Sequence, residues 1–115
     1  MVNLIEITEN NFEEEIYDSK VPVLLDFYSD GCIACERIDK EIQSIANKYN
    51  NKLKIARLNI DECRAIAVAC EIQCTPTILL WVEGDIVDII EGFKNSRILQ
   101  EHVNYHTQRT WLPIK

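Results

Sequence analysis

Two kinds of hydrophobic spacing follow one another along the 115-residue chain. Short runs in which apolar residues alternate or crowd together predict strands, because successive strand side chains point to opposite faces of a sheet. Segments with apolar residues three or four apart predict amphipathic helices, because that spacing places them on one helix face. The predicted strands cover 2–7, 21–28, 53–61, 77–82 and 86–91, and the predicted helices cover 10–18, 32–49, 62–71 and the residues from 96 onward.

Polar residues and glycine mark where several of these elements begin or turn. Thr8 and Ser96 carry hydroxyl groups of the kind that cap helix N-termini, so each is predicted to begin a helix. Gly84 lies in "EGD" between two strands, where it suits the tight turn of a hairpin. The chain therefore ends in a predicted hairpin followed by one helix.

The order β-α-β-α-β-α-β-β-α predicts an α/β fold, with a central mixed β-sheet flanked by helices on both faces. Residues 21–28 are almost entirely apolar, which indicates a strand buried on both faces, although Asp26 interrupts it. No linker divides the chain, so residues 1–115 are predicted to form a single domain. Residues 107–115 are a candidate C-terminal extension, which must change course before Pro113.

Composition and charge narrow the classes of partner. The formal net charge is −7, and the acids are scattered apart from Glu13–Glu15, which argues against nucleic acid or an anionic membrane as a partner. No apolar stretch approaches the ~20 residues that span a bilayer. The N-terminus lacks the basic start and apolar core of a signal peptide, so a cytoplasmic location is expected.

Five cysteines carry the candidate chemistry, and Cys32 and Cys35 form a C-x-x-C motif. Cys32 stands at the predicted junction of strand 21–28 and helix 32–49. A helix N-terminus offers unpaired N–H groups and about half a positive charge, which favour a thiolate over a thiol. Cys35 lies one turn further along the same face. The motif alone is compatible with a metal clip, a structural disulfide or a redox-active dithiol.

Three segments resemble the thioredoxin family. They are "VPVLLDFYSDGCIAC" (21–35), "KLKIARLNID" (52–61) and "CTPTILLWVEGDIVDIIEGF" (74–93), and the likeness extends over about residues 2–106. The resemblance implies a thioredoxin fold and a protein-disulfide reductase or dithiol electron carrier. It implies no cofactor, a monomeric protein, thioredoxin reductase or an equivalent electron donor, and disulfide-containing client proteins.

The same resemblance implies roles for four residues. Cys32 attacks a client disulfide, and Cys35 resolves the mixed disulfide to form a reversible Cys32–Cys35 bond. Asp26 is a buried acceptor for the Cys35 proton, with a pKa that burial raises. Alternatively, Asp26 is a buried acid satisfied by hydrogen bonds or by Arg57. The family commonly has Lys at the position of Arg57, and Arg is expected to hold Asp26 more firmly ionised if the two are close.

The resemblance also implies a substrate surface around the cysteines. A cis bond between Thr75 and Pro76 places the backbone of residue 75 against an extended client segment, and Gly92 leaves room for it. An ordinary trans proline and a glycine that merely ends a strand are the alternatives. The family usually has Trp, Gly and Pro around the first cysteine, where this chain has the substrate-facing residues Gly31, Ile33 and Ala34.

Three further cysteines have a regulatory and a structural interpretation. Cys63 and Cys70 are two helical turns apart and form either an accessory redox switch or a pair of small core residues, which the sequence favours. Cys74 precedes Thr75 beside the expected client surface, where it is a candidate for a mixed or intermolecular disulfide. All three are therefore possible regulatory residues.

Three other functions are alternatives to a general reductase. Zinc bound by Cys32, Cys35, Cys70 and Cys74 would leave Asp26 and the Thr-Pro pair unexplained, so no metal site is expected there. A non-catalytic thioredoxin-fold binding module would not need both cysteines. A specialised redox partner with a narrow client fits the altered 31–36 stretch. His102 and His106, four residues apart, are either metal ligands or ordinary surface residues.

Overall fold

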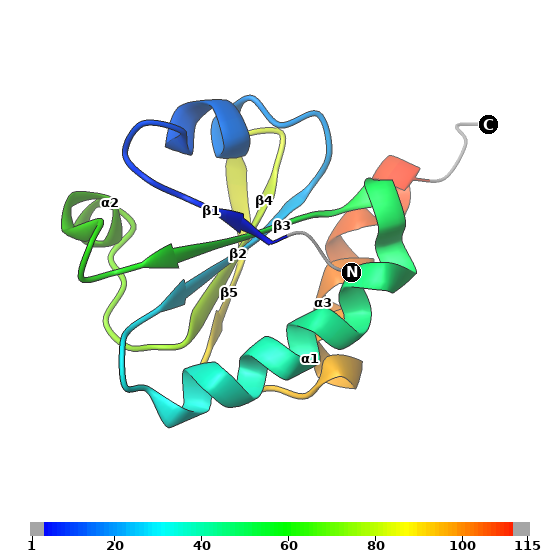
Figure 1. Ribbon diagram of the computed structural model, residues 1–115. Coiled ribbons are helices and arrows are strands. Elements are labelled where there is room, and N and C mark those ends of the chain that lie inside the picture. The colour runs from blue at the N-terminus through cyan, green and yellow to red at the C-terminus, as the bar shows by residue number, and fades with distance from the viewer. Residues whose placement is uncertain (1–3, 112–115) are drawn as a thin grey trace.

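The computed structural model describes residues 4–111. Its elements run in the order β1 (Ile5–Glu6), η1 (Glu13–Tyr17), β2 (Val23–Tyr28), α1 (Ile33–Tyr49), η2 (Asn50–Lys52), β3 (Lys54–Asn59), α2 (Arg64–Ala69), β4 (Thr77–Val82), β5 (Asp85–Glu91) and α3 (Ser96–Trp111) (Figure 1). The predicted alternation of strands and helices, with a hairpin near the end, is confirmed.

The five strands form one mixed sheet in the order β1-β3-β2-β4-β5. β1, β3 and β2 are parallel to one another, whereas β4 is antiparallel to both β2 and β5. β2 is thus central, with β3 on one side and β4 on the other. This position explains its composition, since a strand that is covered on both faces can be apolar at every position.

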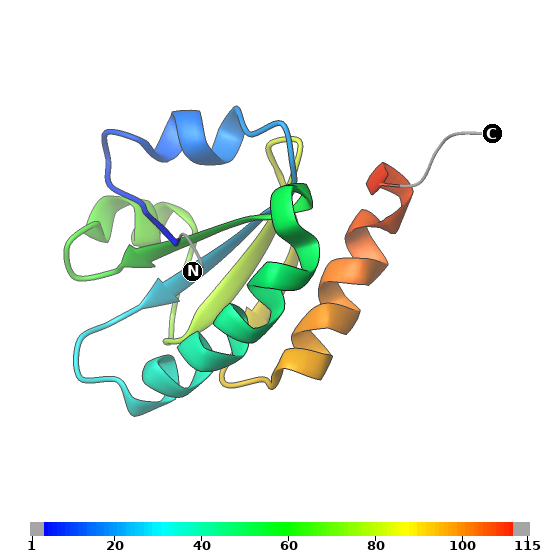
Figure 2. The ribbon, with the colours of Figure 1, turned by 45° about the vertical axis from the view of Figure 1, so that its right-hand side comes forward.

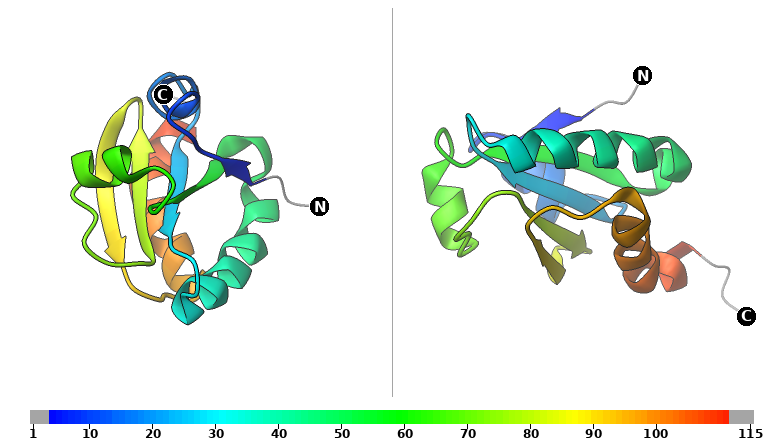
Figure 3. Two further views of the ribbon diagram at one scale, coloured as in Figure 1. Left: turned by 60° about the vertical axis from the view of Figure 1, so that its left-hand side comes forward. Right: turned by 90° about the horizontal axis from the view of Figure 1, so that it is seen from below.

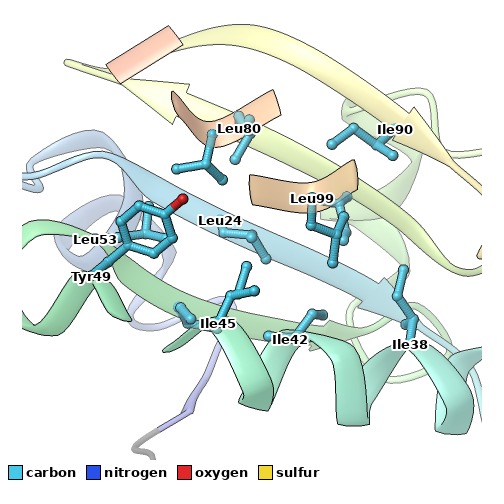
Figure 4. Packing of buried hydrophobic residues seen from close by; sticks show 12 residues of the cluster. Leu24, Ile38, Ile42, Ile45, Tyr49, Leu53, Leu80, Ile90 and Leu99 are labelled. Atoms are coloured by element: carbon cyan, nitrogen blue, oxygen red, sulfur yellow. The ribbon is translucent and has the colours of Figure 1, made fainter. Parts of the chain in front are cut away.

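Helices cover both faces of the sheet. α1 and α3 lie side by side over one face (Figure 2), where Leu24, Ile42, Leu80 and Leu99 pack together (Figure 4). η1 and α2 cover the other face over a second apolar cluster, and Figure 3 shows α2 well apart from α3. Neighbouring residues of one strand, such as Leu24 and Leu25, serve opposite clusters, as the two-residue strand repeat requires.

Two predicted helix starts need correction or refinement. The helix predicted over 10–18 is a single wide turn at 13–17, although the Thr8 hydroxyl accepts a hydrogen bond from the Asn10 N–H at 3.2 Å. Ser96 is not the N-cap of α3. The side chain of Asn95 accepts the Ile98 N–H at 3.0 Å, which is the bond that a capping residue makes. The Ser96 N–H instead donates to Glu41 at 2.7 Å.

The ends of the chain extend past the described residues. The start of the strand predicted over 2–7 and the turn predicted before Pro113 lie outside residues 4–111. Within that range, β1 covers only Ile5–Glu6, and α3 continues as far as Trp111.

The hairpin turn follows the prediction for Gly84. Glu83 and Gly84 both have positive φ, at 53° and 85°, which matches the turn type that suits the twist of paired strands. The turn lets β5 pair antiparallel with β4, and β4 in turn pairs antiparallel with β2. The segment that leads from α2 into β4 consequently reaches the end of the sheet at which β2 runs into α1 (Figure 1).

Candidate active site

Cys32 and Cys35 form a disulfide at the point where β2 gives way to α1, with their Cα atoms 5.2 Å apart. Gly31 precedes the pair with a φ of 72°, and a Cβ added to it would meet nothing within 4 Å. Glycine is favoured here because the backbone turns through a left-handed conformation that other residues adopt at a cost. Gly31 therefore has a role in the backbone turn. The absence of the Trp that the family usually has at this position did not indicate that role.

The two sulfurs have different surroundings. Cys35 is 6% exposed, whereas Cys32 is only partly buried. The backbone N–H of Cys35 donates to Cys32 Sγ at 3.1 Å, and the Thr75 hydroxyl lies 3.8 Å from the same sulfur. Donors of this kind, together with the N-terminus of the 17-residue α1, stabilise a thiolate. These contacts therefore favour the thiolate form of Cys32.

The segment before β4 lies against Cys32. The bond between Thr75 and Pro76 is cis, as the resemblance implied. The hydroxyl groups of Ser29 and Thr75 are 2.8 Å apart, and the backbone oxygen of Thr75 is 3.8 Å from Cys32 Sγ. The Gly92 N–H donates to the Pro76 carbonyl at 2.9 Å. The structure thus places Thr75 beside Cys32 and joins Gly92 to the neighbouring Pro76.

Ile33 and Ala34 stand between the two cysteines in the sequence, where the family usually has Gly and Pro. Ile33 is 74% exposed, which is unusual for a large apolar side chain, whereas Ala34 is partly buried. Gly92 has a φ of 83°, so it has a conformational reason for being glycine in addition to the space it leaves. The motif therefore presents one exposed aliphatic side chain, and Gly31 and Gly92 both occupy positive-φ positions.

Asp26 lies in β2 and is 2% exposed. Its Oδ1 atom is buried and has no hydrogen-bond partner within the described part of the chain. Burial raises the pKa of Asp26 to about 7, because it penalises the charged form, while the positive charge of Arg57 lowers this pKa. The negative charges of Asp39 and Glu6 raise it further. A carboxyl group with such a pKa exchanges protons near neutral pH.

Arg57 is opposite Asp26 in the β2–β3 register. Its guanidinium nevertheless makes its charged contacts elsewhere, at 3.8 Å from Glu6 and 3.9 Å from Asp39, and it lies 4.0 Å from the centre of the Tyr28 ring. No ion pair joins Arg57 to Asp26 among residues 4–111. The charge of Arg57 acts in the expected direction on Asp26, but the effect of burial outweighs it.

Two acidic residues of this cluster were not identified from the sequence. Asp39 follows Cys35 by four residues on α1, so the helical repeat is a signal that would have placed both on one face. Glu6 reaches Arg57 because β1 pairs with β3, which no local pattern reveals. Cys32, Cys35, Asp39 and Arg57 line one cavity of about 190 Å³.

The three other cysteines are free thiols. Cys63 belongs to the core cluster under α2, and its thiol lies 3.6 Å from the Ile7 carbonyl. Burial raises the pKa of both Cys63 and Cys70, which disfavours the reactive thiolate. Cys74 is exposed, with its sulfur 3.6 Å from the Thr77 hydroxyl. These surroundings favour the structural interpretation of Cys63 and Cys70 and leave Cys74 accessible.

The two histidines of α3 bind the same partner. His102 Nδ1 and His106 Nε2 lie 2.6 Å and 3.0 Å from one carboxylate oxygen of Asp88 in β5. Within residues 4–111, no group of three histidine, cysteine or acidic side chains is arranged to hold a metal ion. No helix in the same range is long and apolar enough to cross a membrane.

Comparison with known proteins identifies the family. The thioredoxin family model matches residues 3–105. A thioredoxin of Griffithsia pacifica is 30% identical over 109 residues, which cover 95% of this chain and all of the relative. A thioredoxin of Chlorobaculum thiosulfatiphilum is 35% identical over 101 residues, covering 88% of this chain and 94% of the relative. Thioredoxins are protein-disulfide reductases that draw electrons from a reductase or another donor. The chain belongs to the thioredoxin family and is a thiol–disulfide oxidoreductase.

Proposed function

We propose that the chain reduces disulfides of client proteins with Cys32 as the attacking group, Cys35 as the resolving group and Asp26 as the proton acceptor. The observation that carries this assignment is the asymmetry of the pair, in which the more exposed cysteine also receives the hydrogen-bond donors. Cys35 is buried, and it lines the same cavity as Arg57 and Asp39.

The reaction proceeds in two exchanges. In the first, the Cys32 thiolate attacks one sulfur of the client disulfide, the client S–S bond breaks, and the second client sulfur leaves as a thiolate that takes up a proton. In the second, Cys35 transfers its proton to Asp26, and the Cys35 thiolate attacks Cys32 Sγ. The mixed disulfide breaks, and the first client sulfur leaves as a thiolate that takes up a proton from solvent. The client gains two electrons as the Cys32–Cys35 bond forms.

The client is proposed to bind as an extended segment along residue 75. Thr75 and Pro76 lie beside Cys32, and Gly92 closes the same surface through its bond to Pro76. Main-chain hydrogen bonds give such a complex affinity with little demand on client sequence. Gly31, Ile33 and Ala34 complete the surface on the α1 side.

The exposed Ile33 supports a second candidate, a redox partner that serves a narrow set of clients. Ile33 directly follows Cys32 in the chain and is 74% exposed, so a client would contact it directly. A client with an apolar residue next to its disulfide would bury it on docking. The chemistry is the same as in the general reductase, and only the range of clients differs.

The proposal includes an electron donor, a monomeric state and a cellular compartment. Thioredoxin reductase or an equivalent donor returns electrons to the Cys32–Cys35 bond, and the protein acts as a monomer whose residues 107–115 extend its single domain. A reducing, cytoplasmic compartment suits the three free cysteines. Among them, Cys74 is the candidate for regulation, because it is exposed beside Thr75.

Insulin provides the direct test of the proposed function. With dithiothreitol as electron source, the oxidised protein is expected to speed the reduction of the interchain disulfides of insulin, measured as turbidity from the released chains. Dithiothreitol alone supplies the background rate. A rate equal to that background would contradict the proposed function.

A further inference from the structure

Arg57 lies among three acidic side chains that come from three different elements. Asp26 faces it from β2 in the strand register, Glu6 contacts it from β1 at 3.8 Å, and Asp39 contacts it from α1 at 3.9 Å. Arg57 Nε and one oxygen of each aspartate are buried without a hydrogen-bond partner in the described residues. The single positive charge of Arg57 therefore balances only part of the negative charge of these three carboxylates.

Asp39 occupies a distinctive place in this group. It lies one helical turn beyond Cys35 on α1 and lines the cavity of about 190 Å³ together with both cysteines and Arg57. Its side chain is 26% exposed, whereas that of Glu6 is 48% exposed. Since charges near solvent are screened, Asp39 acts on its buried neighbours more strongly than Glu6 does.

We propose that Asp39 is a positioning residue for the second exchange, because it holds the Arg57 guanidinium away from Asp26 and places a negative charge beside it, so that Asp26 binds the Cys35 proton more tightly. This inference rests on the proposed role of Asp26 as proton acceptor. It gives a role in the reaction to Asp39, which is not part of the pattern formed by the C-x-x-C motif, Asp26 and the Thr-Pro pair.

Asp39 affects Asp26 in two ways. A negative charge near a buried carboxyl group disfavours its ionised form, and an arginine drawn toward a second carboxylate stabilises the first one less. The charges that face Asp26 are Arg57 from β3, Asp39 from α1 and Glu6 from β1. Among residues 4–111, Arg57 is the charge that favours the ionised form of Asp26, and Asp39 opposes it both directly and through Arg57.

Asp39→Asn tests the inference, with Glu36→Gln as the matched control. Glu36 lies on the same helix and lines the same cavity, but its exposed charge is screened by solvent. The measurement is the carbon-13 chemical shift of the Asp26 carboxyl group in the oxidised protein, followed as a function of pH. The midpoint is expected to fall by roughly half a pH unit in Asp39→Asn and to stay unchanged in Glu36→Gln. Asp39→Glu, which keeps the charge, is expected to restore most of the wild-type midpoint.

Two outcomes separate this inference from the function on which it rests. An unchanged Asp26 midpoint in Asp39→Asn, or an equal fall in both variants, would overturn the role of Asp39 and leave that of Asp26 intact. The second readout is the rate at which Cys35 resolves a mixed disulfide, measured against pH. If the midpoint of Asp26 moves and this pH profile does not follow it, the assignment of Asp26 as proton acceptor is wrong.

Discussion

Replacing Cys32 with serine is expected to reduce insulin reduction to the rate of dithiothreitol alone. A serine hydroxyl does not ionise near neutral pH, so the backbone donor of Cys35 and the hydroxyl of Thr75 would face a group that cannot attack a disulfide. The buried Cys35 cannot take over, since it is 6% exposed and a client cannot reach it. The loss is therefore expected to be complete.

Cys74→Ser is the control for this experiment, because Cys74 is the exposed free thiol beside the same surface. That variant is expected to retain most of the wild-type rate. Insulin reduction that survives in Cys32→Ser and disappears in Cys74→Ser would move the attacking role to Cys74. A Cys32→Ser variant with wild-type activity would refute the assignment outright.

Asp26→Asn is expected to make the oxidised protein more stable at neutral and alkaline pH. The folded protein holds the pKa of Asp26 at about 7 against an ordinary value of 3.8. Between these two values the unfolded chain releases the proton while the folded chain keeps it, so the free energy of unfolding falls as the pH rises. Three pH units correspond to a loss of about 4 kcal/mol, which is an upper bound.

Asparagine resembles the protonated acid in shape and charge, so it removes this pH dependence. Urea unfolding of both proteins at pH 4 and pH 8 is the measurement. A small difference is expected at pH 4, and the variant is expected to be more stable by a few kcal/mol at pH 8. Equal stabilities at pH 8 would show that Asp26 is ionised in the folded protein without cost, contrary to its burial.

The same variant is expected to be a poorer catalyst. Asparagine cannot accept the Cys35 proton, so resolution of the mixed disulfide is expected to slow by about 10²-fold, within the usual range for a lost general base. Water and hydroxide still accept the proton, so activity persists at a reduced level. Stopped-flow measurement of client release separates this step from the first exchange, whose rate is expected to be unchanged.

Much of the fold follows from local hydrophobic patterns, because the sheet imposes them strongly. β2, β3 and β4 are buried on both faces, and α1 has one continuous apolar face that includes Ile38, Ile42 and Ile45. The start of α3 was less predictable. Ser96 and Asn95 both have side chains that can cap a helix, and only the backbone geometry selects Asn95.

The candidate site was predictable where a single residue type determines the chemistry. Two cysteines after a buried strand, an acid within that strand and a Thr-Pro pair are visible in the sequence, and the structure places the backbone oxygen of Thr75 3.8 Å from Cys32 Sγ. The charge cluster was not visible in this way. Asp39, Glu6 and Arg57 come together only through the pairing of β1 with β3 and the packing of α1 over the sheet.

Cys35→Ser gives the most direct test of the central claim that Cys32 attacks and Cys35 resolves. Without the resolving thiol, the first exchange should stop at a stable mixed disulfide. The purified variant would be mixed with a disulfide-containing protein, and the cross-linked peptides would be identified by mass spectrometry. A client cysteine joined to Cys32 is expected. A client joined to Cys74, or no trapped complex while turnover continues, would contradict it.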